Sequence, residues 1–233
     1  MARKKMKSES GPFHPTNICK PGALPSMFIF HGITFSCLFS LEQPALFPNH
    51  TNFQHTVDMC GHANEPYYIC NPAEYGSYSQ DCKTENAAIY FDQEAFHAKQ
   101  LLCKQPVKYT TALKDLQLWG GKPKKQLPGI GAHSSTMLAS EFVYQGIVAH
   151  PTAEEMGSTV WHIKSGALGG LTYLQILPLG KVTKAATMAT FKSAYEHLDN
   201  TLPNTTKQSI GFDEIMVEHL LCKVARWLHF CKD

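Results

Sequence analysis

The eight cysteines of this 233-residue chain constrain its fold more than any other feature, because their chemical state depends on the compartment in which the chain folds. Six of them follow an apolar segment at residues 27–41, and these are Cys60, Cys70, Cys82, Cys103, Cys222 and Cys231. If that segment directs export, we predict that the six thiols form three disulfides. In a reducing compartment they are free thiols or metal ligands instead.

The apolar segment at residues 27–41 has two interpretations. It has about the length of the apolar core of a signal peptide. The basic residues before it are Arg3, Lys4, Lys5, Lys7 and Lys20. His31 and Gly32 interrupt it, and no small-residue cleavage site follows, so the alternative is a pair of buried strands joined near His31. No uninterrupted run of about 18 apolar residues exists, so we expect membrane contact only if this segment is an anchor.

Two Asn-x-Thr sequons follow the apolar segment, at Asn49 and Asn204. In a secreted protein each is an acceptor for N-glycosylation and lies in a surface loop. Together with the even cysteine count, the sequons favour a secreted or ER-lumen glycoprotein. A cytoplasmic protein remains the alternative.

The composition divides the chain into three parts. Residues 1–26 are basic and rich in proline, which predicts a flexible, irregular leader. Residues 27–41 are the apolar segment. Residues 42–233 are predicted to form one domain, whose first part is rich in Cys and Pro and has no sustained helical or strand period.

The apolar pattern predicts an α+β fold. Apolar residues recur at helical spacing in three segments, residues 84–103, 183–199 and 212–231. β-Branched and aromatic residues between Gly and Pro breaks predict three strands, at residues 141–149, 159–164 and 171–177. We therefore expect a single domain with a small central sheet and helices grouped around it. In the last helix, Leu220, Val224 and Trp227 share one stripe, so we expect Trp227 to be buried.

A lysine-rich stretch suggests an anionic partner. Residues 96–140 contain seven lysines and one acidic residue, and Lys122, Lys124 and Lys125 lie in a loop rich in Gly and Pro. Such an excess of positive charge attracts sulfated sugar, lipid headgroups or an RNA backbone, although a solvated loop has the same composition. Arg3 and Arg226 are the only arginines, which argues against sequence-specific recognition of nucleic acid.

A metal site is the main alternative. His55, Cys60, His62 and Cys70 are close in sequence, and zinc accepts mixed sets of Cys and His ligands. Their spacing matches no structural zinc pattern, so a disulfide knot competes with this interpretation. His219 and Cys222 share a helix face and could form half of a second site.

One short segment, residues 162–172, resembles the region around a copper-ligand histidine in copper nitrite reductases. The Cys-His ligand pair of that family has no counterpart, because residues 191–219 contain no cysteine. No function is carried over from this resemblance.

The residues favour a binding protein over an enzyme. We expect an exported, disulfide-stabilised glycoprotein whose lysine-rich loop meets an anionic polymer or another protein, with no cofactor and no assigned catalytic residue. The first alternative is a zinc- or copper-dependent enzyme, or a zinc-stabilised domain, that uses Cys60, His62 and Cys70. The second is an intracellular interaction protein with free thiols.

Overall fold

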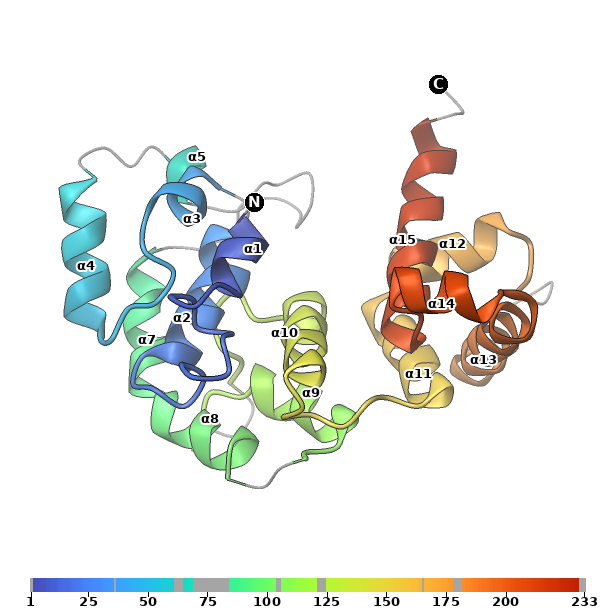
Figure 1. The fold of residues 1–233 in the computed structure, drawn as a ribbon, viewed down its shortest axis with the longest axis horizontal. Coiled ribbons are helices and arrows are strands. Elements are labelled where there is room, and N and C mark those ends of the chain that lie inside the picture. The colour runs from blue at the N-terminus through green and yellow to red at the C-terminus, as the bar shows by residue number, and fades with distance from the viewer. Residues whose placement is uncertain are drawn as a thin grey trace. The chain divides into compact units, whose positions relative to one another are not determined.

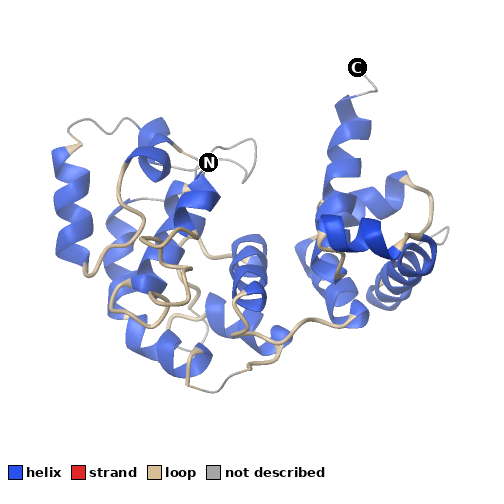
Figure 2. Ribbon diagram, in the orientation of Figure 1, coloured by secondary structure: helices blue, strands red, loops and turns tan. Residues whose placement is uncertain are grey.

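Helices account for all the regular secondary structure that the chain shows in its described parts (Figures 1 and 2). The structure is a computed structural model that describes residues 2–35, 37–60, 65–68, 84–103, 106–120, 125–164, 166–177 and 182–230. Over these ranges the β-type pairing is limited to two isolated bridges, Val107 with Val148 and Leu118 with Gln126. The predicted α+β fold with a central sheet is therefore wrong. The chain forms two units, residues 1–149 (unit 1) and 150–233 (unit 2).

Each of the three predicted strands overlaps the end of a helix and forms no strand. Residues 141–149 contain the end of α10 (Ala132–Tyr144), residues 159–164 the end of α11 (Ala153–Ile163), and residues 171–177 the end of α12 (Ala167–Tyr173). Short apolar runs fit a buried helix as well as a strand, so periodicity alone does not separate them. A capping box starts α11: the Thr152 side chain accepts from the Glu155 N–H, and the Glu155 carboxylate accepts from the Thr152 N–H.

Unit 1 is built around α2 (Ala23–Ile29) and the π-helix η1 (Phe30–Thr34), whose residues are all buried. Its other elements before α10 are α1 (Ala2–Met6), α3 (Leu38–Glu42), α4 (His50–Met59), α5 (Glu65–Tyr68), η3 (Thr84–Asn86), α7 (Ala87–Asp92), α8 (Glu94–Leu101) and α9 (Tyr109–Gln117). Helices α7 and α8 pack against α2, and α10 packs against η1. The helix expected at residues 84–103 is present as η3, α7 and α8.

Residues 1–26, predicted as a flexible leader, pack onto the rest of unit 1. After α1 the chain follows a series of turns in which Phe13 is 1% exposed and its ring lies 6.2 Å from that of Phe142. Lys7 Nζ lies 2.6 Å from the buried carboxylate of Glu141 on α10. The side-chain amide of Asn17 donates to the main-chain oxygens of Glu9 and Gly11. Aromatic burial and this ion pair hold the segment in place.

The described residues of the apolar segment at 27–41 include the end of α2, η1 and most of α3, so the alternative of two buried strands is corrected. Met27, Phe28, Ile29 and Ile33 are buried in the centre of unit 1. No helix among the described residues is both long enough and apolar enough to span a bilayer.

Unit 2 consists of two pairs of packed helices and a short connecting helix. After α11 and α12 come α13 (Lys184–Thr201), α14 (Asn204–Ile210) and α15 (Glu214–Phe230). Helix α11 packs on α13, and α12 packs on α15. Glycines make both contacts close: a Cβ at Gly157 would lie 2.7 Å from Met188 Cα, and one at Gly170 would lie 2.2 Å from the Leu221 main-chain oxygen.

The helices predicted at residues 183–199 and 212–231 are present as α13 and α15, but the expected burial of Trp227 is wrong. Trp227 is 65% exposed and Leu220 is 38% exposed. The buried side of α15 carries Ile215, Val217 and Leu221 instead. The helix has apolar residues on two sides, and α12 covers the side that the predicted stripe does not contain.

The prediction of three disulfides is also wrong. Cys60, Cys103 and Cys222 are free thiols, as are Cys19 and Cys37, while Cys70, Cys82 and Cys231 lie outside the described residues. An even cysteine count does not bring two sulfur atoms within bonding geometry. Hydrogen bonds engage two of the thiols instead: Cys37 Sγ donates to the Thr34 oxygen and Cys222 Sγ donates to Glu218 Oε1.

Candidate functional site

The lysine-rich loop is closed at its base by main-chain pairing. It leaves the end of α9 at Leu118, and Leu118 forms an antiparallel bridge with Gln126 on the returning side of the loop. The Trp119 N–H donates to the Lys125 oxygen at 3.0 Å, and the Leu127 N–H donates to the Gln117 oxygen at 2.9 Å. Lys122 and Lys124 lie outside the described residues. Main-chain hydrogen bonds therefore hold the two ends of the loop together.

Lys125 is the described cation of this loop, and an aromatic ring orients it. Its Nζ lies 4.9 Å from the centroid of the Trp119 ring, while the side chain remains exposed. A lysine above an aromatic ring at an exposed site gains about 0.5–1 kcal/mol. The charge is therefore held near the base of the loop and is accessible to a ligand.

The loop rests on α8. A Cβ at Gly120 would lie 2.4 Å from Phe96 Cγ, so the absence of a side chain there allows the close approach. His97, the next residue of α8, is fully buried, with its ring 4.9 Å from that of Phe28. Burial lowers the pKa of His97 to about 4, and the main chain of Leu118 opposes this shift. At neutral pH an uncharged ring therefore lies beneath the loop base.

Three more exposed lysines belong to the elements that support the loop. Lys99 lies on α8 one turn after Phe96, Lys114 lies on α9, and Lys108 precedes α9. Helices α8 and α9 pack against each other. None of the ion pairs found within the described ranges involves Lys99, Lys108, Lys114 or Lys125. Their charges are available to an external anion.

The predicted metal cluster is only partly described. His55 is exposed on α4, Cys60 follows the end of that helix, and His62 and Cys70 lie outside the described residues. Among the described residues, Tyr67 approaches Cys60, with its hydroxyl 3.9 Å from Sγ. Across the described residues, no three His, Cys, Asp or Glu side chains gather as metal ligands. A zinc or copper site with His62 and Cys70 stays a prediction.

The second histidine–cysteine pair is engaged in other contacts. His219 Nδ1 lies 2.9 Å from the Ile215 main-chain oxygen, whereas Cys222 Sγ lies 3.2 Å from Glu218 Oε1. Burial, followed by the charge of Glu218, raises the pKa of the Cys222 thiol. A protonated, buried thiol is a poor nucleophile and a poor ligand. The segment that resembles the copper nitrite reductases is helical here, formed by the end of α11 and by α12.

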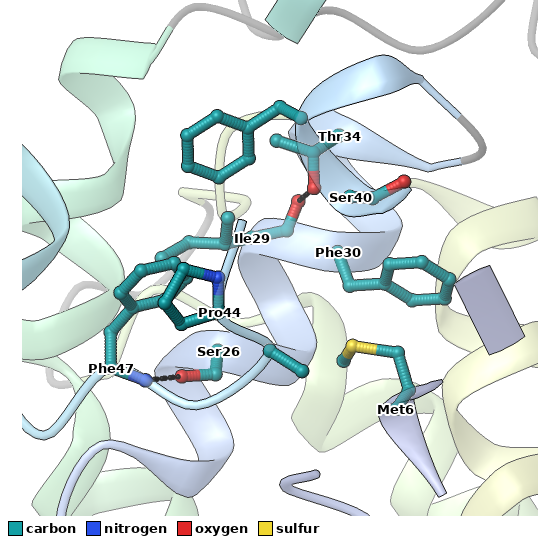
Figure 3. A pocket seen from close by; sticks show the side chains of 10 residues that line it. Met6, Ser26, Ile29, Phe30, Thr34, Ser40, Pro44 and Phe47 are labelled. Carbon is teal, nitrogen blue, oxygen red and sulfur yellow. Dashed lines mark hydrogen bonds between the residues drawn. The ribbon is translucent and has the colours of Figure 1, made fainter. Parts of the chain in front are cut away.

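A small hollow lies between η1, α3 and the segment that follows α3, and Figure 3 shows its lining. The space within it that the centre of a water molecule can occupy is only about 10 Å³, and apolar side chains such as Met6, Phe30 and Phe47 line it. Its hydroxyl groups are already paired: Ser26 Oγ accepts from the Phe47 N–H at 2.9 Å, and Thr34 donates to the Ile29 oxygen. The hollow has no free polar group to orient a ligand.

Both sequon asparagines are exposed. Asn49 is the N-cap of α4, where its Oδ1 accepts from the Asn52 N–H at 2.9 Å, and Asn204 is the first residue of α14. The cap uses the oxygen of Asn49 and leaves its amide nitrogen out of that bond. Glycosylation at the two positions stays a prediction.

Sequence reasoning identified Lys125 but missed the residues that position it. The count of charges alone does not distinguish Trp119, Gly120 or His97 from the rest of the chain. The local signal was the order Trp-Gly-Gly at residues 119–121, where an aromatic residue precedes a close backbone approach. No family model matches this chain, and neither the curated proteins nor the solved structures include a significant match to it.

Proposed function

We propose that this chain is a binding protein that holds an anionic polymer on a lysine site in unit 1, which we define as Lys99, Lys108, Lys114 and Lys125. The observation that carries the proposal is the closed loop base, where Lys125 stacks on Trp119. A solvated connector needs neither a paired base nor an aromatic platform for one of its lysines. Pre-organised charges lose less entropy when a ligand binds.

The chemistry of the site favours a ligand with many negative charges over a ligand that is recognised by its sequence or shape. Lysine is a point charge without the bidentate geometry of arginine, and the site contains no arginine. The face of Trp119 on which Lys125 lies is not open for stacking with a base or a sugar ring. The ligand class is therefore a polyanion, such as a sulfated polysaccharide or a nucleic-acid backbone, that is bound without sequence preference.

Salt dependence of binding tests the proposal. We expect the chain to bind heparin and mixed-sequence single-stranded RNA at low salt, with affinity falling linearly on a log–log plot against salt concentration. The triple variant Lys99→Gln, Lys114→Gln, Lys125→Gln should reduce the slope for RNA by about 0.7 for each phosphate that is no longer neutralised. Fluorescence anisotropy with labelled ligand measures both affinity and slope.

The matched control removes the same charge elsewhere. Lys4, Lys20 and Lys184 are exposed and lie outside the lysine site, so their triple Gln variant has the same net charge as the test variant. We expect this control to bind almost as the unmodified chain does. Equal weakening in the two triple variants, or no binding to either polymer at low salt, contradicts the proposal. Vesicles with and without anionic lipid show whether the same lysines respond to headgroups.

A further inference from the structure

Helix α15 carries a second stripe, in which Met216 is half-buried and the residues that follow it are exposed. Met216, Leu220, Lys223 and Trp227 follow one another at spacings of four, three and four residues, so they lie on one side of the helix. Trp227 is 65% exposed and Leu220 is 38% exposed. We call these four residues, together with Arg226 at their edge, the outer face of α15.

The opposite side of α15 is fully used. Ile215 and Leu221 are buried, and Gly170 of α12 lies directly against the Leu221 main chain. Cys222 Sγ would lie 2.5 Å from a Cβ at Gly166, so the start of α12 also closes over this sulfur atom. Helix α12 therefore packs on the inner side of α15 and leaves Leu220 and Trp227 exposed on the outer side. Tryptophan is enriched at protein–protein interfaces relative to the rest of the protein surface.

The outer face carries positive charge, so a partner that binds it should carry negative charge. Lys223 lies within the stripe and Arg226 lies beside Trp227, and both are exposed. No ion pair in the described part of the chain includes either of them. Arg226 is one of only two arginines in the chain, and arginine pairs with carboxylates in bidentate geometry. Tryptophan and arginine are also among the residues most enriched at interface hot spots.

We propose that the outer face of α15 docks an acidic amphipathic helix of a partner protein. Apolar side chains of the partner pack on Leu220 and Trp227, and its carboxylates pair with Lys223 and Arg226. The stripe has the spacing with which one helix packs along another, and Arg226 can pair with a carboxylate of the partner in bidentate geometry. This inference concerns unit 2 and is independent of the lysine site in unit 1.

The experiment uses the full chain and two synthetic helical peptides. Both peptides have leucine at the a and d positions of three heptads, and the remaining positions carry mainly glutamate in one and lysine in the other. We expect the glutamate peptide to bind with a blue shift of tryptophan emission, and the lysine peptide to bind at least about tenfold more weakly. Trp227→Ala should weaken binding of the glutamate peptide about thirtyfold or more, and Lys223→Gln with Arg226→Gln about fivefold.

Controls separate docking from loss of fold and from membrane binding. Leu174→Ala removes another exposed side chain of unit 2, outside α15, and should leave the peptide affinity unchanged. The melting temperature of Trp227→Ala should stay near that of the unmodified chain, because the ring is mostly exposed. The proposal is overturned if the glutamate peptide does not bind, if both peptides bind equally, or if anionic vesicles bind through Trp227 while the peptide does not.

Discussion

The two units of this chain are stabilised in different ways. In unit 1, fully buried aromatic rings fill the interior, among them Phe13, Phe28, Tyr90 and Phe142. Several of its helices start without a side-chain cap, as α2 does at Gly22. In unit 2, Phe191 is the aromatic side chain that is fully buried among the described residues, and the helices meet at glycines.

Local signals are correspondingly stronger in unit 2. Helix α11 begins with a capping box, Thr183 caps α13, and Asp213 accepts from the Met216 N–H at the start of α15. A cap stabilises the start of its own helix and does not require that helix to pack on another. A capped helix can therefore keep part of its apolar surface exposed. Burial of aromatic side chains defines unit 1 as a whole. We therefore expect that removing a buried aromatic side chain lowers the stability of unit 1 most. Adding a side chain at a glycine where two helices meet should lower the stability of unit 2 most.

The largest effect is expected from Phe28→Ala in unit 1. The Phe28 ring is fully buried, 5.7 Å from the Tyr90 ring and 4.9 Å from the His97 ring. Its removal should lower the free energy of unfolding by about 3–5 kcal/mol, because apolar burial is reduced and a cavity remains. Hydrogen exchange measured by mass spectrometry should show faster exchange in α2, α7 and α8, with α11 and α13 unchanged. Equal loss of protection in both units would show that they are not independent.

A smaller effect is expected from Gly170→Ala in unit 2. The added Cβ would lie 2.2 Å from the Leu221 main-chain oxygen, so α12 and α15 would have to separate. Overpacking of this kind costs about 1–3 kcal/mol. Exchange should accelerate in α12 and α15 and stay unchanged in α8 and α10. The control is Gly131→Ala, where a Cβ meets nothing within 4 Å, and this variant should be close to the unmodified chain in stability.

The smallest effect is a loss of stability of unit 1 in mild acid. Burial lowers the pKa of His97 to about 4 from an ordinary value of 6.5. Between these values the unfolded chain binds a proton that the folded chain does not, so stability falls as the pH drops below 6.5. From pH 6.5 to about pH 5 the loss should be about 1–2 kcal/mol, since a full proton difference is about 1.4 kcal/mol per pH unit.

The acid prediction has a residue-specific control. His97→Phe keeps an aromatic ring between Phe28 and Phe96 but cannot take up a proton. Urea unfolding followed through unit 1 should then lose its pH dependence over this range. A pH dependence that persists in His97→Phe would assign the acid effect to another group. Burial raises the pKa of Glu94, so this carboxyl acts in the opposite direction: the folded chain takes up its proton before the unfolded chain does as the pH falls.

Within this comparison, sequence reasoning was most successful where signals are local. The helices at residues 84–103, 183–199 and 212–231 were predicted from spacing and are present. Two of the strands failed because α10 and α11 bury β-branched and aromatic residues, such as Phe142, Val143 and Val160, on helices, where packing overrides propensity. In α12 the residue of the predicted strand that is buried is Leu171, whereas Tyr173 is exposed. The Thr152 capping box was visible in the sequence and would have corrected one of the three strands.

The candidate sites follow the same division. The positive charge around Lys125 was evident from composition, whereas its platform on Trp119 and the buried His97 beneath Leu118 depend on contacts between segments. The disulfide prediction rested on the even number of cysteines. A disulfide forms only where two sulfur atoms lie within bonding distance, and the number of cysteines says nothing about those distances.

The sequence by itself determined that this chain forms amphipathic helices in its C-terminal half, that its charge gathers between residues 96 and 140, and that its arginines are scarce. Only the tertiary structure decided which side of each helix is buried. On α15 the sequence offers two apolar sides, and the glycines of α12 select the one with Leu221 and leave Trp227 in solvent. The physical reason is that periodicity defines a face, whereas burial depends on what another part of the chain brings against it.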